Sequence, residues 1–153
     1  MTHIKTLFFT IIMATILGCS SKTNNKLVDN KLADLLEKKD YFKLKDELIK
    51  NEKELTPDRV LFYNVFISKA FGDRQKSNSE VAILFERYYK TLNDTTIVKL
   101  LDVKAANYLY LYEYKKASLI YEEILGKHSK ILDSTDVADY KNVSSSHKCN
   151  FLS

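Results

Sequence analysis

Few residues of this 153-residue chain have the types and the spacing that catalysis or metal binding requires. The chain holds three glycines, which lie far apart at Gly18, Gly72 and Gly126 and so cannot form a Gly-rich phosphate loop. The histidines outside the N-terminal segment, His128 and His147, show no second ligand at His-x-x-x-His spacing, and each is predicted to be a lone surface residue. We therefore predict no metal ion and no cofactor.

Two aspartates begin segments that partly match Asp-Thr/Ser-Gly, the catalytic motif of aspartic proteases. Asp94-Thr95-Thr96 and Asp133-Ser134-Thr135 hold its first two residues, but both lack the glycine and the flanking apolar strands. Aspartic proteases need two aspartates that lie on tight turns, close enough to share a proton. Because neither segment has the residues of such a turn, both are predicted to be helix caps instead. The polar run 144–147 predicts no catalytic triad, and Cys149 has no positioned histidine partner. The chain is predicted not to be an enzyme.

The clearest chemical signal is at Cys19, near the N-terminus. Met1–Lys5 carries positive charge, and Leu7–Leu17 is an apolar run shorter than the roughly 20 residues that span a bilayer. Ile16-Leu17-Gly18-Cys19 resembles the bacterial lipobox, although Leu is commoner than Ile at its first position. In that motif the cysteine after a small residue is diacylated and becomes the new N-terminus.

The resemblance to the lipobox implies a lipoprotein with a signal peptide over residues 1–18, cleaved after Gly18. It implies palmitate-type acylation of Cys19 and a polar tether over residues 19–26. The expected location is the cell envelope, lipid-anchored to a bacterial membrane, with the outer membrane favoured over the inner one. An ordinary secretory signal or a short membrane anchor is the alternative. Lipidation of Cys19 would leave Cys149 alone, so no disulfide scaffold is expected.

Composition favours a single all-α domain. Apolar residues make up 45% of the chain, whereas three Gly and one Pro are too few for a turn-rich β-sandwich. The net charge of +4 is mild, and Lys and Glu are interspersed as on solvated helix faces. A nucleic-acid partner is therefore not expected.

Apolar residues recur at helical spacing through most of the chain. The predicted helices cover 27–38, 40–50, the segment from Thr56-Pro57 to a left-handed Gly72, a segment capped by Ser79, 96–112, 114–127, and a last segment capped by Ser134 or Thr135. The polar run 73–78 is predicted to be a loop. The run Tyr108–Tyr112 is interpreted as a helix end, with a strand as the alternative. The helical pattern stops after Asn142, so residues 143–153 are predicted to be an irregular tail.

Between residues 100 and 125 the sequence resembles a tetratricopeptide repeat, a pair of antiparallel helices of about 34 residues. Leu101, Ala105 and Tyr108 match its first helix, and Glu113–Ala117 with Tyr121 matches the turn and the second helix. Asp40–Leu44 is a weaker echo of that turn. The resemblance implies stacked antiparallel helical hairpins within a helical-repeat domain over 27–142, and a plain helical bundle is the alternative.

Stacked hairpins of this kind form a concave groove that suits a peptide or a protein helix. Four residues of the repeat are candidates for lining such a groove or for packing inside it: Tyr108, Tyr114, Ala117 and Tyr121. The chain holds ten tyrosines, and tyrosine offers both contact area and a hydroxyl. The alternative is that most of these rings fill the core.

A second resemblance covers about the same residues. Lys39–Leu48, Leu61-Phe62-Tyr63 and Tyr114–Leu125 are similar to the helical N-terminal region of certain exported retropepsin-like aspartic proteases. The protease domain is absent from this chain, and no position matches its catalytic motif. The tail after 142 is then either the product of a shifted or prematurely ended reading frame or an ordinary terminus.

Three functions follow as hypotheses. The first is a membrane-anchored, non-catalytic module that binds a protein or peptide of unknown identity. The second is the truncated accessory region of a membrane-tethered aspartic protease, which predicts Asp-Thr-Gly in another frame of the downstream DNA. The third is a purely structural envelope lipoprotein.

Overall fold

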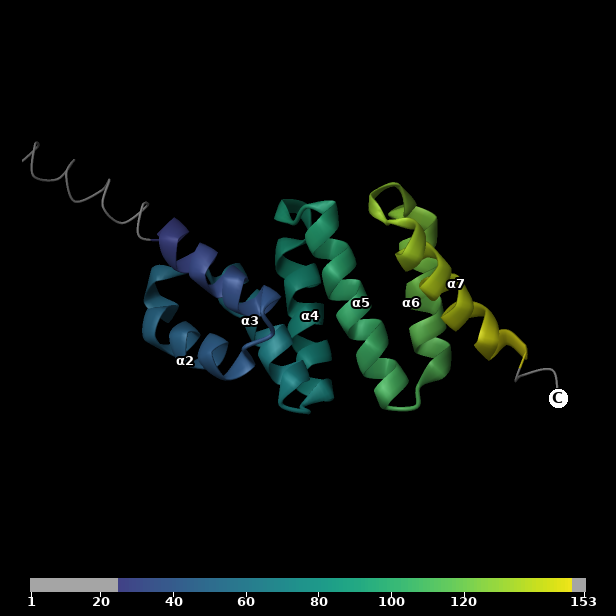
Figure 1. Ribbon diagram of the computed structural model, residues 1–153, viewed down its shortest axis with the longest axis horizontal. Helices are drawn as coiled ribbons and strands as arrows, with labels where there is room; N and C mark the ends of the chain where they lie inside the picture. The colour runs from purple at the N-terminus through teal and green to yellow at the C-terminus, as the bar shows by residue number, and fades with distance from the viewer. Residues whose placement is uncertain (1–24, 150–153) are drawn as a thin grey trace, which may run out of the picture. The chain divides into compact units, whose positions relative to one another are not determined.

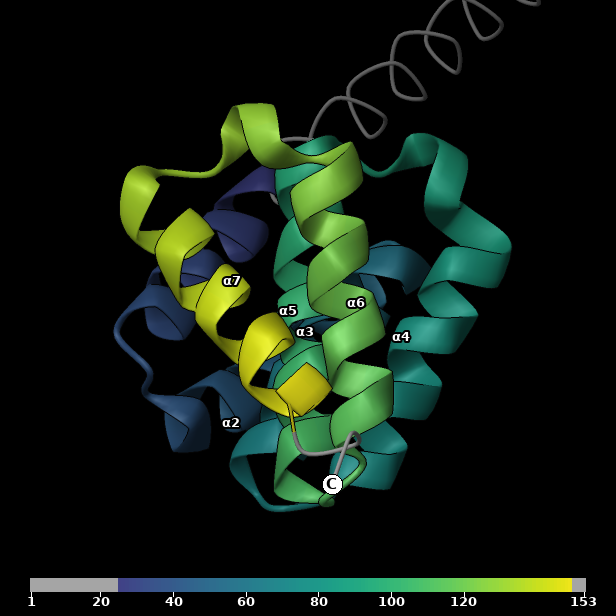
Figure 2. The same ribbon diagram turned by 90° about the vertical axis from the view of Figure 1, so that its right-hand side faces the viewer.

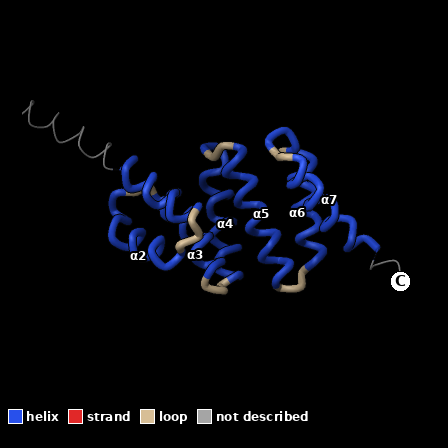
Figure 3. Tube along the Cα trace, in the orientation of Figure 1, coloured by secondary structure: helices blue, strands red, loops and turns tan. Residues whose placement is uncertain are grey.

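The computed structural model describes residues 25–149, and every regular element among them is a helix (Figure 1, Figure 3). The predicted all-α class is thereby confirmed for this part of the chain. The predicted signal peptide and the predicted lipidation site Cys19 lie outside the described residues. Within 25–149, no helix combines the length and the apolar character that crossing a membrane requires.

The chain divides into two compact units, Met1–Val60 and Leu61–Ser153, which are described separately. The described part of the first unit holds a helix over 25–37, α2 (Tyr41–Asn51), the 3-10 turn η1 (Glu52–Glu54) and the first residues of α3 (Pro57–Ala70). Its small core consists of Leu32, Leu44 and Leu48. An ion pair of 2.7 Å joins Lys31 Nζ to Glu47 Oε2 across the two helices.

The second unit contains the rest of α3 and all later elements. These are α4 (Arg74–Tyr88), η2 (Tyr89–Thr91), α5 (Asp94–Tyr110), α6 (Tyr114–Lys127), η3 (Ser129–Ile131) and α7 (Ser134–Cys149). Helix α5 packs against α4 and α6, and α6 packs against α7. From α4 to α7, successive helices run in opposite directions (Figure 1, Figure 2). The core cluster of this unit comes from α5 and α6: Ile97, Val98, Leu101, Ala105, Ile120, Tyr121 and Ile124.

Three tight turns between helices have the same backbone geometry. The residue in the left-handed region is Lys39 in the first turn, Gly72 in the second and Tyr112 in the third, with φ of 56°, 88° and 60°. In each turn the next residue's N–H donates to a carbonyl five residues earlier, at 3.0, 2.9 and 2.8 Å. These bonds define a Schellman motif, which satisfies carbonyls at the end of a helix. The predicted left-handed Gly72 is confirmed.

The longer connections repeat as well. After η1, η2 and η3 the chain becomes extended at Leu55, Leu92 and Leu132, whose N–H groups donate to the carbonyls of the first residues of these turns. In two of the three connections the following residue caps the next helix with its side chain, because Asn93 accepts from Thr96 N and Asp133 from Asp136 N, both at 2.8 Å. Two kinds of connection therefore alternate along the described chain.

Several predicted boundaries are confirmed. Helix α3 begins at Pro57, as the Thr56-Pro57 pair predicts, and α6 covers the predicted 114–127. The alternating run from Tyr108 belongs to α5 as far as Tyr110, so the strand alternative is wrong. Its residues do not alternate between a polar and an apolar face, which a half-buried strand would require.

The loop predicted over 73–78 is wrong. Asp73 caps α4, accepting from Lys76 N at 3.0 Å, and the helix begins at Arg74 rather than after Ser79. Two polar residues of its first turns, Ser77 and Glu80, are buried and have hydrogen-bond partners inside the fold. The fully buried Ser77 donates to the Val65 carbonyl at 2.9 Å. The polar run therefore combines exposed side chains with hydrogen-bonded ones at a helix interface, and both are compatible with a helix.

The irregular tail predicted over 143–153 is wrong for its described part, because α7 continues to Cys149. Val143 packs against the core cluster, and the buried Ser144 accepts from Ser118 Oγ at its carbonyl oxygen, at 3.3 Å. The serine hydroxyls are accommodated inside the helix, since Ser144 and Ser145 both donate to the Lys141 carbonyl. Serine can form such bonds within a helix, so a serine run does not by itself end one.

Candidate functional site

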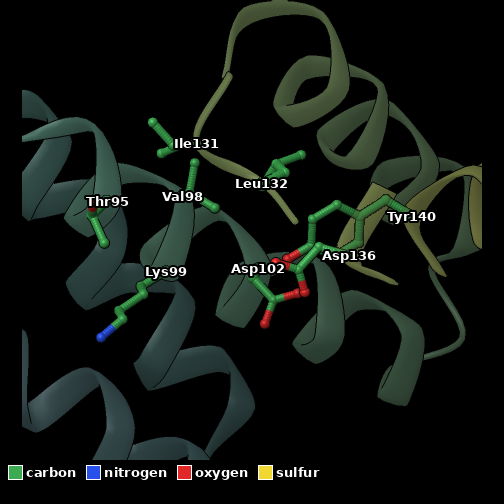
Figure 4. Close-up of a pocket in the computed structure, with 8 residues that line it drawn as sticks. All are labelled: Thr95, Val98, Lys99, Asp102, Ile131, Leu132, Asp136 and Tyr140. Carbon is green, nitrogen blue, oxygen red and sulfur yellow. The ribbon is translucent and has the colours of Figure 1, made fainter. Parts of the chain in front are cut away.

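A small pocket of about 190 Å³ lies where α7 faces α5 in the second unit (Figure 4). Its lining combines charged, aromatic and aliphatic side chains: Thr95, Val98, Lys99, Asp102, Ile131, Leu132, Asp136 and Tyr140. The carboxylates of Asp102 and Asp136 point toward one another, whereas Lys99 extends away from them (Figure 4). The pocket therefore has an acidic end and apolar walls.

The helices that carry the acidic end are held by apolar packing. Asp102 lies on α5 beside the buried Val98 and Leu101, so its side chain sits at the border of the core. Asp136 and Tyr140 are one turn apart on α7, which places them on the same helix face. The Tyr140 ring stacks on Tyr121 of α6, with centroids 4.9 Å apart and an angle of 24° between the planes.

The pKa of Asp102 is raised above its usual value, mainly because burial penalises the carboxylate. Two neighbours act in the opposite direction: the positive charge of Lys69 on α3 and the hydroxyl of Tyr140, which donates to the carboxylate. The negative charge of Asp136 raises the pKa further. The surroundings thus compensate only part of the charge of Asp102.

The tyrosines beside Asp102 are held in their neutral form. Burial and the charge of Asp102 raise the pKa of Tyr121 to about 12. Burial likewise raises the pKa of Tyr140, and Asp102 and Asp136 add to the effect. Tyr140 therefore keeps its proton at neutral pH and remains a hydrogen-bond donor to Asp102.

A buried amide fixes α5 on its other side. Asn107 is fully buried, and its Nδ2 donates to Ser77 Oγ at 2.9 Å and to Asn78 Oδ1 at 3.0 Å. Its Oδ1 accepts from Arg74 Nη1 at 3.4 Å, and the guanidinium of Arg74 lies 4.5 Å from the centroid of the Tyr110 ring. These contacts join α4 to α5 and hold the helix that carries Asp102.

The four residues predicted to line or fill a groove lie in different surroundings. Ala117 and Tyr121 are buried in the packing of α6. Tyr108 is half-buried against the core, and Lys116 Nζ lies 5.2 Å from its ring centroid. Tyr114 is 38% exposed and makes an edge contact with the Tyr112 ring beside the third tight turn. None of the four lines the α5–α7 pocket.

Two of the residues weighed for chemistry lie elsewhere than predicted. Asp133 does cap a helix, but Asp94 is the first residue of α5, whose cap is Asn93. His128, predicted at the surface, is only 8% exposed, and its Nδ1 lies 3.7 Å from Asp94 Oδ1. His128 caps the C-terminus of α6, where its backbone N–H donates to the Ile124 carbonyl. Within 25–149, no three His, Cys, Asp or Glu side chains gather as a metal site would require.

The residues that line the pocket were not predicted as a site from the sequence. A usable signal was present, because Asp102 lies four residues after Val98 and three before Ala105, both on the apolar stripe of α5. An acidic residue on a core-facing stripe is unusual and points to a specific environment. Asp136 and Tyr140 lie one turn apart on the last predicted helix, but no local pattern indicates that this helix packs beside α5.

Over the described residues 25–149, the fold of this chain is all-α, and a small acidic pocket lies in the second unit. Comparisons with protein-family models, with curated proteins and with solved structures gave no match. Its function is therefore inferred from the geometry described above.

Proposed function

We propose that the protein is a membrane-anchored lipoprotein whose helical part is a non-catalytic, tetratricopeptide-like module that binds another protein. The observation that carries the proposal is the pocket between α5 and α7, where a partly uncompensated carboxylate faces a second one above apolar walls. Such a pocket offers both charge and apolar contact area for recognition.

The alternation of connections along the chain supports the repeat. Tight turns at Lys39, Gly72 and Tyr112 share one geometry, and the connections through Leu55, Leu92 and Leu132 share another. A chain built from one supersecondary unit used repeatedly is expected to have this pattern. The pairs that result are the helix over 25–37 with α2, α3 with α4, and α5 with α6, followed by α7.

The pocket lies on the first helix of the third pair, α5, and on the helix that follows that pair, α7. In stacked helical hairpins, equivalent helices of successive repeats form a continuous binding surface. A site shared between α5 and α7 supports the use of this surface for a partner. Anchoring through Cys19 rests on the lipobox-like segment and would hold such a module at the membrane.

The binding function is tested by site-specific photocrosslinking in the cells that produce the chain. A benzophenone amino acid replaces the exposed Lys99 at the pocket, and in a matched control it replaces the exposed Lys115 on α6. We expect one discrete crosslinked protein at Lys99 and none at Lys115. Equal crosslinking at both positions, or none at Lys99, contradicts the proposal.

The anchoring is tested separately, with Cys19→Ala. Acyl labelling with a palmitate analogue and fractionation of the envelope compare this variant with the wild type. We expect the label and the membrane association to be lost together, because a chain without the lipid has no anchor. Unchanged labelling of the variant would exclude Cys19 as the lipid attachment site.

A further inference from the structure

We propose that the α5–α7 pocket receives the cationic end of one basic side chain, lysine or arginine, from the protein partner. This inference rests on the proposed binding function and adds the chemistry of the contact. Three properties of the pocket support it: its size, the nature of its walls and the arrangement of its charges.

The size of the pocket limits the ligand to one side chain. Its volume of about 190 Å³ is smaller than the roughly 300–1,000 Å³ of pockets that bind drug-sized molecules. It exceeds the roughly 150 Å³ of an engineered protein cavity that binds benzene. A single long side chain therefore fits this space, whereas a cofactor or a nucleotide would not.

The walls of the pocket suit an aliphatic stem. Val98, Ile131 and Leu132 contribute methyl groups, and Tyr140 adds an aromatic ring. Lysine and arginine side chains pack their methylene stems on surfaces of this kind while their charged ends reach polar groups. A small hydrophilic cation would gain nothing from these walls.

The charges at the end of the pocket suit a cation with several donors. Asp102 and Asp136 present acceptor oxygens that point toward one another, and Tyr140 donates to Asp102 on one side (Figure 4). An ammonium or guanidinium group placed between the carboxylates would remove their mutual repulsion and form charge-assisted hydrogen bonds. An anionic side chain would be repelled, and an uncharged one would leave the repulsion in place.

The test uses small probes and the full-length chain in a non-ionic detergent. The probes are the N-acetyl methylamides of lysine, arginine and norleucine, the last of which resembles lysine but lacks its charge. Binding is read from the NMR signal of a methyl group of Ile131, which lines the pocket, with the half-buried Ile83 of α4 as a control signal. We expect saturable shifts at Ile131 but not at Ile83, with roughly millimolar affinity for a single side chain.

We expect norleucine to bind at least about tenfold more weakly than the better cation, since it cannot form the charge-assisted bonds. The nearly isosteric variants Asp102→Asn and Asp136→Asn should each weaken binding of the cation by about tenfold or more. Glu86→Gln, which alters an exposed acid on α4, should leave it unchanged. The spectrum of each variant verifies folding independently of binding.

The outcomes separate this inference from the proposed function. Binding of one cation but not the other supports the inference and identifies the side chain. Absence of binding by both cations, equal binding of norleucine, or unchanged affinity in both Asn variants overturns it. If the crosslink at Lys99 then persists, the binding function stands and only the assigned chemistry fails. If cations bind but no crosslink forms, the proposed function fails instead.

Discussion

Replacing Asn107 with alanine should destabilise the protein more than any other single polar-to-alanine change at the α4–α5 contact. Asn107 is fully buried and makes three hydrogen bonds, with Ser77, Asn78 and Arg74. At about 1 kcal/mol for each bond, we expect a loss of about 3 kcal/mol in the free energy of unfolding. A loss of that size lowers the melting temperature by roughly 10 °C for a domain of this length.

The partners of Asn107 explain why the loss should not be larger. Ser77 keeps its bond to the Val65 carbonyl, so its hydroxyl does not become wholly unsatisfied. Asn78 is half-buried and can turn to water once its amide partner is gone. An unsatisfied buried group would add a further penalty of about 1–3 kcal/mol, which these two residues largely avoid.

The assay is urea unfolding followed by circular dichroism at 222 nm, with Asn78→Ala as the matched control. Asn78 has the same side chain as Asn107 but makes only one of the three hydrogen bonds. Asn78→Ala should therefore lower the free energy of unfolding by about 1 kcal/mol. A loss below about 1 kcal/mol for Asn107→Ala, or one no larger than that of the control, would refute the reasoning. The network would then contribute little to holding α5 in place.

Three further changes test the turns, a buried acid and a cap. Gly72→Ala should cost about 1–2 kcal/mol, measured by urea unfolding, because φ is +88° while an added Cβ meets nothing within 4 Å, so only backbone strain acts; no loss would show that the turn relaxes. Burial raises the pKa of Glu80 in the folded protein above that in the unfolded chain. The stability that Glu80 contributes is therefore complete at pH values below the unfolded pKa, and it is lost as the pH rises through the folded pKa. Glu80→Gln should therefore have a higher melting temperature than the wild type at pH 7, and the difference in melting temperature should narrow toward pH 4.5. A difference that stays constant with pH argues against titration of Glu80. Asp133→Ala should cost about 1 kcal/mol in thermal unfolding through loss of the cap on α7, and Asp139→Ala, an exposed change on the same helix, should cost less than half of that.

The helices and some of their ends could be predicted from the sequence because the signals are local. Pro57 marks a helix start and Gly72 a left-handed end, since each residue type has a backbone preference that neighbours need not supply. The same logic failed at Lys39 and Tyr112, which adopt the left-handed conformation without being glycine. There the Schellman hydrogen bonds outweigh the local preference, and no single residue reveals them in advance.

The candidate site could not be predicted because it depends on contacts between distant segments. Asp102 and Asp136 are separated by α6, and only the packing of α7 brings their carboxylates together. Ser144 lies in a serine run that resembles an irregular tail until its burial against α6 is known. In each case the sequence shows which chemical group the residue carries, but not which residue it contacts.

The two polar clusters of the second unit differ in a way that separates structure from function. Both polar groups of the Asn107 amide have partners, as expected of a buried amide that serves the fold. Asp102 keeps a raised pKa in spite of Lys69 and Tyr140, because burial and Asp136 oppose them. Packing does not require these charges, since α7 is already held by the Tyr121–Tyr140 stack and by Val143 against the core. A carboxylate with a raised pKa, beside a second carboxylate in an accessible pocket, is what the proposed recognition of a cation requires, whereas the stability of the protein alone does not require it.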